Sequence, residues 1–249
     1  MNSSVCPSAG TRPPLVALHY VAARMAAAEV LVSPVVDGVA TITLNRPEKR
    51  NALSVAVRDL VSDALDSLAA DERVQCVVLT GAGTVFCAGF DLSEFRIEDP
   101  EFQKQLWSSS HRFHRTVLCF PLPLVASING PALAGGFDLA VMCDIRVGAS
   151  TDRFAHPEQA WSQVVYGPLE ALVGGAVARD LCFTGREIDA TEAFRFGLLS
   201  AVVDPAALGD HTASVVAAIT RAPRAVLMTT KRKALARAGI DPKSPTLDL

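Results

Sequence analysis

Two acidic residues stand out because of the residues around them. Asp138 lies in a stretch, Leu133 to Met142, in which every other residue is apolar or glycine. A carboxylate buried there without a partner costs several kcal/mol or has a raised pKa, and either consequence suits a general acid or base. Glu158 follows twenty residues later, after Pro157, which is well placed to begin a helix. Two positioned acids could shuttle a proton, one accepting it and the other delivering it.

Each acid also has a simpler interpretation. Asp138 could cap the backbone N–H groups of its own helix, and Glu158 could be a surface residue in a first helical turn. The proton-transfer hypothesis therefore depends on what surrounds the two side chains.

Two glycine-containing turns could present free backbone N–H groups to a ligand. In the first, Ala88 and Gly89 are small enough for a ligand to approach the backbone, and the N–H of Phe90 would be free. In the second, Gly135 and Gly136 begin a helix at the positive end of its dipole. A Gly-Gly pair alone is more typical of close packing, but two such turns facing each other would form an oxyanion hole.

Other chemistries lack their signatures. Gly81-Ala82-Gly83 begins like a dinucleotide fingerprint, but Phe86 occupies the place of the third glycine. Neither GxSxG nor HExxH occurs, so no motif in the sequence supports an esterase or a zinc peptidase. We therefore expect no cofactor and no metal site.

The elements that must position these residues alternate between strands and helices. The expected strands are 30–32 and 39–44, joined as a hairpin around Asp37-Gly38, then 74–80, 124–128 and 145–149. The first expected helix begins after Ser54, which can cap it, and the others cover 101–119, 134–143, 190–196 and 211–222. Asp91 is a further candidate helix cap. This order predicts α/β layers with a helical C-terminal region.

The totals favour one large domain in the cytoplasm. The 249 residues are 50% hydrophobic, enough to bury a sizeable core. A formal charge of -3 gives no general attraction to nucleic acid, and no apolar run reaches the roughly 18 to 20 residues of a membrane span. The six cysteines are scattered without a CxxC pair, as is typical of reduced cytoplasmic thiols.

The N-terminal segment differs in composition from the rest. It is Ser/Pro-rich over residues 1–14 and Ala-rich afterwards, and His19 and Arg24 interrupt its apolar stretch, which argues against a signal peptide. We expect a disordered or helical extension over residues 1–28, a core over 29–200 and a C-terminal helical region over 201–249.

Several segments resemble, in order and spacing, the motifs of the enoyl-CoA hydratase/isomerase (crotonase) family. They are Asn45 to Leu53, Phe86 to Leu92, Ile128 to Asp144, Phe154 to Glu158, and Ala178 to Leu199. The resemblance covers roughly Val30 to Ala234. It implies a crotonase-like spiral of ββα turns over residues 29–200, with a C-terminal region that is short for the family.

The resemblance also implies an acyl-CoA thioester as substrate. The thioester oxygen would be held by the N–H groups of Phe90 and Gly135, while Asp138 and Glu158 correspond to the two hydratase acids. Those acids would position a water for addition across the 2,3 double bond and deliver a proton to C2. The residues expected to bind the substrate are Ala52, Ala88, Phe90, Asp91, Leu92 and Gly135. Coenzyme A is then part of the substrate, and a homotrimer or a dimer of trimers is expected.

Three departures from the family pattern leave a hydratase, an isomerase and a non-catalytic acyl-CoA-binding protein as alternatives. The first acid is usually Glu, whereas Asp138 also matches dienoyl-CoA isomerases, which carry a further Asp where this chain has Tyr166. Residues 161–168 replace a glycine-rich turn. The chain ends soon after residues 231–233, so a neighbouring subunit would complete the wall of the site.

The remaining conspicuous residues have simpler expected roles. We expect His111 and His114 on an exposed helix face, residues 231–233 on a solvated helical face, His156 in a supporting place, and Trp107 and Trp161 as packing groups.

Overall fold

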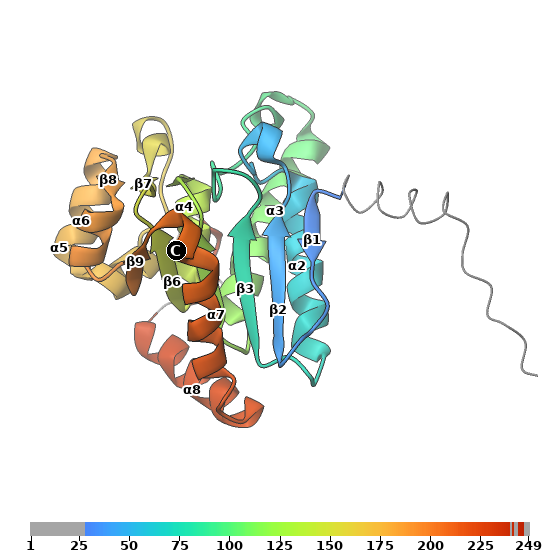
Figure 1. Ribbon diagram of the computed structural model, residues 1–249. Coiled ribbons are helices and arrows are strands. Elements are labelled where there is room, and N and C mark those ends of the chain that lie inside the picture. Colours follow the sequence, from blue (N-terminus) through green and yellow to red (C-terminus); the bar gives the residue numbers. More distant parts are fainter. Residues whose placement is uncertain (1–27, 240, 242–243, 247–249) are drawn as a thin grey trace, which may run out of the picture.

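The computed structural model describes residues 28–239, 241 and 244–246, and strands alternate with helices along these residues (Figure 1). The expected extension over residues 1–28 lies, except for its last residue, outside the described part. The strands are β1 Val30–Val32, β2 Val39–Leu44, β3 Cys76–Gly81, β4 Leu124–Ile128, β5 Ala132–Leu133, β6 Ile145–Ala149, β7 Arg153–Ala155, β8 Ile188–Asp189 and β9 Ala201–Val203. The helices are α2 Val55–Ala70, α3 Pro100–Cys119, α4 Gly135–Met142, α5 Gly167–Thr184, α6 Ala190–Arg195, α7 Leu208–Ile219 and α8 Arg224–Ala238. Short 3-10 helices cover Pro47–Lys49, Glu94–Arg96, Pro157–Ala160 and Pro205–Ala207.

The strands form two sheets. The larger has the order β1-β2-β3-β4-β6-β9, and all of its pairs are parallel except the β1-β2 hairpin. The smaller has the order β5-β7-β8. The hairpin is confirmed: its turn residues Asp37 and Gly38 have φ angles of 49° and 80°, the positive values that tight hairpin turns require. Ser54 caps α2 as predicted, since its side chain accepts a hydrogen bond from the N–H of Val57 at 3.2 Å.

The large sheet is covered on both faces, because successive residues of a strand point to opposite sides. Val77 and Leu79 of β3 belong to the main core cluster, which includes the apolar face of α2. Val78 belongs to a second cluster that contains Val216 of α7. Accordingly, Figure 1 shows α2 and α3 on one side of the strands and α7 on the other.

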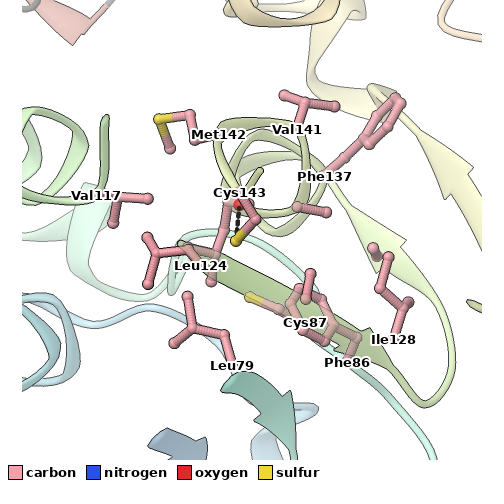
Figure 2. Packing of buried hydrophobic residues seen from close by; sticks show 14 of the residues in the cluster. Leu79, Phe86, Cys87, Val117, Leu124, Ile128, Phe137, Val141, Met142 and Cys143 are labelled. Atoms are coloured by element: carbon pink, nitrogen blue, oxygen red, sulfur yellow. Dashed lines mark hydrogen bonds between the residues drawn. The ribbon is translucent and has the colours of Figure 1, made fainter. Parts of the chain in front are cut away.

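Helix α4 is buried along its whole length, with every one of its residues in the interior. Phe137, Val141 and Met142 of this helix belong to the main core cluster, and Figure 2 shows Leu124 of β4 between this helix and Leu79 of β3. A helix that is apolar all round belongs in a core. The helix is therefore held firmly, and its single carboxylate, Asp138, lies in apolar surroundings.

Two expectations about surface residues are wrong. His114 is only 1% exposed, because it falls on the same periodic face of α3 as the buried residues Ser110 and Val117. Lys231 is 8% exposed, and its Nζ lies 2.5 Å from a carboxylate oxygen of Asp144. Both residues are drawn inward by packing between elements that are distant in the sequence.

The C-terminal third contains two short strands, β8 and β9, that periodicity does not reveal, and β9 joins the large sheet inside the region predicted as helical. The boundaries at residues 29, 200 and 201 stay predictions. Among the described residues, no helix is long and apolar enough to cross a membrane.

Candidate active site

The first predicted turn has the free N–H group that the sequence suggests. Gly89 has a φ of +91°, a conformation that L side chains rarely adopt. Its carbonyl accepts a hydrogen bond from the N–H of Leu53 at 2.8 Å, and its own N–H points to the sulfur of Cys87 at 3.4 Å. The N–H of Asp91 is bonded to the carbonyl of Leu53. Between these anchored groups, the N–H of Phe90 has no partner within the part of the chain that the structure describes.

The second turn lies directly against the first. A Cβ added to Gly89 would lie 3.1 Å from the nitrogen of Gly135, and one added to Gly135 would lie 3.7 Å from the nitrogen of Phe90. Within residues 28–239, the N–H of Gly135 likewise has no hydrogen-bond partner. The same added Cβ on Gly135 would be 2.8 Å from the ring of Phe90, so only glycine fits. The two N–H groups can thus donate to one oxygen atom.

Ala134, just before α4, has an unusual backbone conformation. Its φ of 51° and ψ of -132° place an alanine in a region that glycine normally occupies. Such a conformation costs about 1 to 3 kcal/mol and persists only where surrounding structure imposes it. Here the N–H of Ala134 donates to the carbonyl of Ala155 at 2.9 Å, and its carbonyl accepts from the N–H of Asp138 at 3.0 Å.

We therefore expect Ala134→Gly to raise the free energy of unfolding by about 1 kcal/mol. Removal of the Cβ relieves the strain, and the larger chain entropy of glycine in the unfolded state offsets about 0.5 to 1 kcal/mol of the gain. Urea denaturation of the two proteins measures the difference. A loss of stability on substitution would show that the backbone at Ala134 is not strained.

Both candidate acids contact one imidazole. His156 Nδ1 lies 3.0 Å from Glu158 Oε1, to which it can donate a hydrogen bond, and 3.8 Å from Asp138 Oδ1. The side chain of His156 is fully buried, and those of Asp138 and Glu158 are 8% and 16% exposed. The ring also packs on Phe137 with centroids 4.7 Å apart. His156 thus has the supporting position that the sequence suggests, and it brings the two acids together.

The carboxylate of Asp138 is not a helix cap, which removes the simpler interpretation of this residue. Helix α4 has no side-chain cap, and Asp138 Oδ1 has no hydrogen-bond partner among the described residues. Glu158 Oε2 is also buried without such a partner. Each acid thus keeps one buried carboxylate oxygen that no hydrogen-bond donor among the described residues satisfies.

The surroundings shift the acid–base properties of this cluster. Burial raises the pKa of Asp138 from 3.8 to about 7; the positive charge of His156 opposes the rise, and the negative charge of Glu158 adds to it. Burial alone would lower the pKa of His156, but the hydrogen bond to Glu158 and the charge of Asp138 raise it above its ordinary value. A carboxyl group with a pKa near 7 can both give and take a proton at neutral pH.

The acids and the two turns open onto one cavity of about 400 Å³. Its lining contains most of the predicted site residues, namely Ala88, Phe90, Leu92, Gly135, Asp138 and Glu158. Ala52 and Asp91 do not line it. Instead, Arg46 Nη1 donates to the carbonyl oxygen of Ala52 at 3.0 Å and to the carboxylate of Asp91 at 3.3 Å, so these residues brace the first turn. Asp91 accepts from the N–H of Ser93 and does not cap a longer helix.

Several residues that line the cavity were not predicted to belong to the site from the sequence. Trp107 and Trp161 both line the cavity. Trp107 is half-buried and packs on Phe95, as expected of a packing group, whereas Trp161 is 66% exposed, so the packing role expected of Trp161 is wrong. Phe95 and Thr246 also line it. Thr246 could not be found by pattern, because it reaches the site from near the end of the chain.

Arg58 is the other residue that the sequence did not single out. It is 0% exposed, and its guanidinium lies 4.4 Å from the centre of the Phe90 ring. It donates to the carbonyl oxygens of Leu53 and Leu106 at 3.1 and 3.2 Å. Burial lowers the pKa of Arg58 to about 10. A signal existed, since Arg58 lies on the helical face that carries the buried residue Val61.

Comparisons with known proteins agree with this architecture. The crystal structure of enoyl-CoA hydratase from Bacillus anthracis superposes with a TM-score of 0.81 and 29% identity, covering 86% of this chain and 85% of that one. The short-chain-enoyl-CoA hydratase of Clostridium acetobutylicum is 35% identical over 198 residues, 77% of this chain and 76% of that protein. The 1,2-epoxyphenylacetyl-CoA isomerase of Escherichia coli is 32% identical over 193 residues, 73% of this chain and 72% of that protein.

The fold is therefore the crotonase-like α/β fold that the sequence predicts, with helices at its C-terminal end. Residues 35–247 match the enoyl-CoA hydratase/isomerase family, so the chain belongs to that family and is one of its enzymes.

Proposed function

We propose that this protein is an enoyl-CoA hydratase, which adds water across the 2,3 double bond of an enoyl-CoA thioester. The observation that carries the proposal is the convergence of two acids and two free N–H groups on one cavity. Asp138 and Glu158 meet at His156, and Gly135 lies three residues before Asp138 on the same buried helix.

The reaction follows from this geometry. The N–H groups of Phe90 and Gly135 donate to the thioester oxygen and stabilise the negative charge that develops on it. A water held by Asp138 and Glu158 forms a bond from its oxygen to C3, while one of the carboxylates takes the proton that the water loses. The electrons of the double bond move toward the thioester and form the enolate. C2 of the enolate then takes a proton from the acid pair, so one water has been added and the enzyme is unchanged.

The magnitudes support both parts of this site. A positioned acid or base contributes about 10² to 10⁴ in rate. One oxyanion donor contributes about 10² to 10³. The loss of one acid or of one oxyanion donor should therefore lower the rate by an amount that can be measured.

An isomerase is the second candidate, because the 1,2-epoxyphenylacetyl-CoA isomerase is nearly as similar to this chain as the short-chain hydratase. In that case a single acid would move a proton between carbons and no water would be added. The third candidate, a non-catalytic acyl-CoA-binding protein, would use the cavity without proton transfer.

Mass spectrometry of a panel of enoyl-, dienoyl- and acyl-CoA thioesters incubated in ¹⁸O-labelled water separates the three candidates. A hydratase produces a thioester heavier by one labelled water. An isomerase produces a product of unchanged mass that separates by chromatography and takes up deuterium from D₂O. A binding protein leaves every thioester unaltered. We expect the labelled hydrate, and its absence across the panel would contradict the proposal.

We also propose that the chain assembles as a homotrimer or a dimer of trimers and acts in the cytoplasm. Phe183, Phe194 and Val226, which lie on three helices, are 70%, 51% and 53% exposed, and an assembly would cover apolar side chains of this kind. The cysteines that the structure describes are free thiols, as suits a reducing compartment. Light scattering of the purified chain measures the assembly.

A further inference from the structure

One wall of the cavity is a continuous row of aromatic rings. Phe90 and Phe95 stack with centroids 6.3 Å apart and an interplanar angle of 18°. Phe95 and Trp107 meet edge to face at 6.2 Å and 79°. All three rings line the cavity. Another aromatic ring could therefore pack against either the faces or the edges of the rings in this row.

The row begins at the predicted reacting centre. Phe90 supplies one of the free N–H groups, and its ring lies directly over Gly135, which supplies the other. Arg58 holds the ring from outside the cavity at 4.4 Å and is itself fixed by its bonds to Leu53 and Leu106. The aromatic wall is therefore rigid at this end. Because the rings share one cavity with Asp138 and Glu158, which would act on C2 and C3 of the acyl group, the group that contacts the wall is the acyl group.

A fourth ring joins the lining from another element. Trp161 follows the 3-10 helix that carries Glu158, and its N–H donates to the carbonyl oxygen of Glu158 at 2.8 Å. It belongs to residues 161–168, where the sequence departs from the usual glycine-rich turn. The indole is thus placed by the same turn as the acid and adds an aromatic surface next to it.

Thr246 gives the cavity a polar wall that is held in place. It is 3% exposed, and its Oγ1 lies 3.1 Å from Ser110 Oγ and 3.0 Å from His111 Nδ1. A buried hydroxyl with two partners moves aside only if hydrogen bonds are broken. A group bound against Thr246 therefore meets a fixed hydroxyl and not a movable side chain.

We propose that the acyl group taken by this site ends in an aromatic ring, so that the substrate is a 3-aryl-2-enoyl-CoA and not a straight-chain enoyl-CoA. The inference rests on the proposed function for the thioester and the double bond. A flat ring gains ring–ring contacts with Phe95 and Trp107 in addition to the burial of apolar surface that an alkyl chain also gains. Each such contact corresponds to about a twofold to tenfold gain in affinity.

Calorimetric titration with two saturated thioesters of nine acyl carbons, 3-phenylpropanoyl-CoA and nonanoyl-CoA, tests the inference without any turnover. We expect the aryl thioester to bind about tenfold more tightly to the unaltered chain. Trp107→Leu and Phe95→Leu should each remove most of that difference. The matched control is Phe102→Leu, which makes the same change at a partly exposed phenylalanine outside the cavity lining and should leave the difference intact.

The outcomes separate the inference from the proposed function. Equal or tighter binding of nonanoyl-CoA, or equal weakening of both thioesters by the two Leu variants, would overturn the aryl specificity alone. Failure of both thioesters to bind would overturn the proposed function together with the inference. Free coenzyme A is titrated in parallel, and a loss of its binding in Trp107→Leu would mean that the rings hold the adenine, which also overturns the inference.

Discussion

Asp138→Asn is expected to lower kcat for hydration of an enoyl-CoA by about 10²-fold to 10⁴-fold, and Glu158→Gln is expected to have an effect of the same size. An amide has nearly the shape of the carboxyl group but neither accepts a proton from water nor delivers one to C2. The N–H groups of Phe90 and Gly135 are unchanged in both variants. The affinity for a saturated acyl-CoA should therefore stay within a small factor of that of the unaltered protein.

The same two substitutions at surface residues serve as controls. Asp210→Asn and Glu72→Gln make the same substitutions at exposed residues that do not line the cavity and should leave kcat unchanged. The double variant Asp138→Asn with Glu158→Gln should lose little more than the worse single variant, because acids that act as one unit are not additive. Turnover at the unaltered rate in either single variant would contradict the role assigned to that acid.

The parts of the site that the sequence predicts are those governed by local geometry. Gly89 and Gly135 lie in turns where a Cβ would collide with the opposite turn, and that requirement shows in the sequence as glycine. Asp138 is conspicuous because α4 is otherwise apolar. Ser54 and the Asp37-Gly38 turn are likewise local signals. Each of these depends on a few consecutive residues.

The parts that the sequence does not predict depend on contacts between distant segments. Thr246 reaches Ser110 across 136 residues, and Lys231 reaches Asp144 across 87. His114 was expected on the surface because a histidine in a polar helix is usually exposed, but packing at this position buries it. No periodic pattern encodes which partner a buried polar residue will meet.

Asp138→Asn, which is expected to lower activity, should raise the free energy of unfolding, relative to that of the unaltered protein, as pH rises toward neutral. Because burial raises the pKa of this carboxyl from 3.8 to about 7, the folded protein keeps a proton that the unfolded chain has already lost between those pH values. Stability therefore falls as pH rises through this window. His156 and Glu158 face the carboxyl and are the charged groups that modify the effect.

Asp138→Asn removes this titration, so the stability of the variant relative to the unaltered protein should rise as pH rises from 5 to 7 and level off above pH 7. Two pH units at about 1.4 kcal/mol each make this relative stability grow by about 3 kcal/mol. Urea denaturation at pH 5, 6, 7 and 8 measures it, with Asp210→Asn as the control that should show no such growth. A gap that does not change with pH would show that the carboxyl is not held in its protonated form. If the difference in stability between the two proteins grows with pH, the carboxylate of Asp138 both speeds the reaction and weakens the fold above pH 7. This trade-off is expected where an acid is kept in an apolar helix for its chemistry.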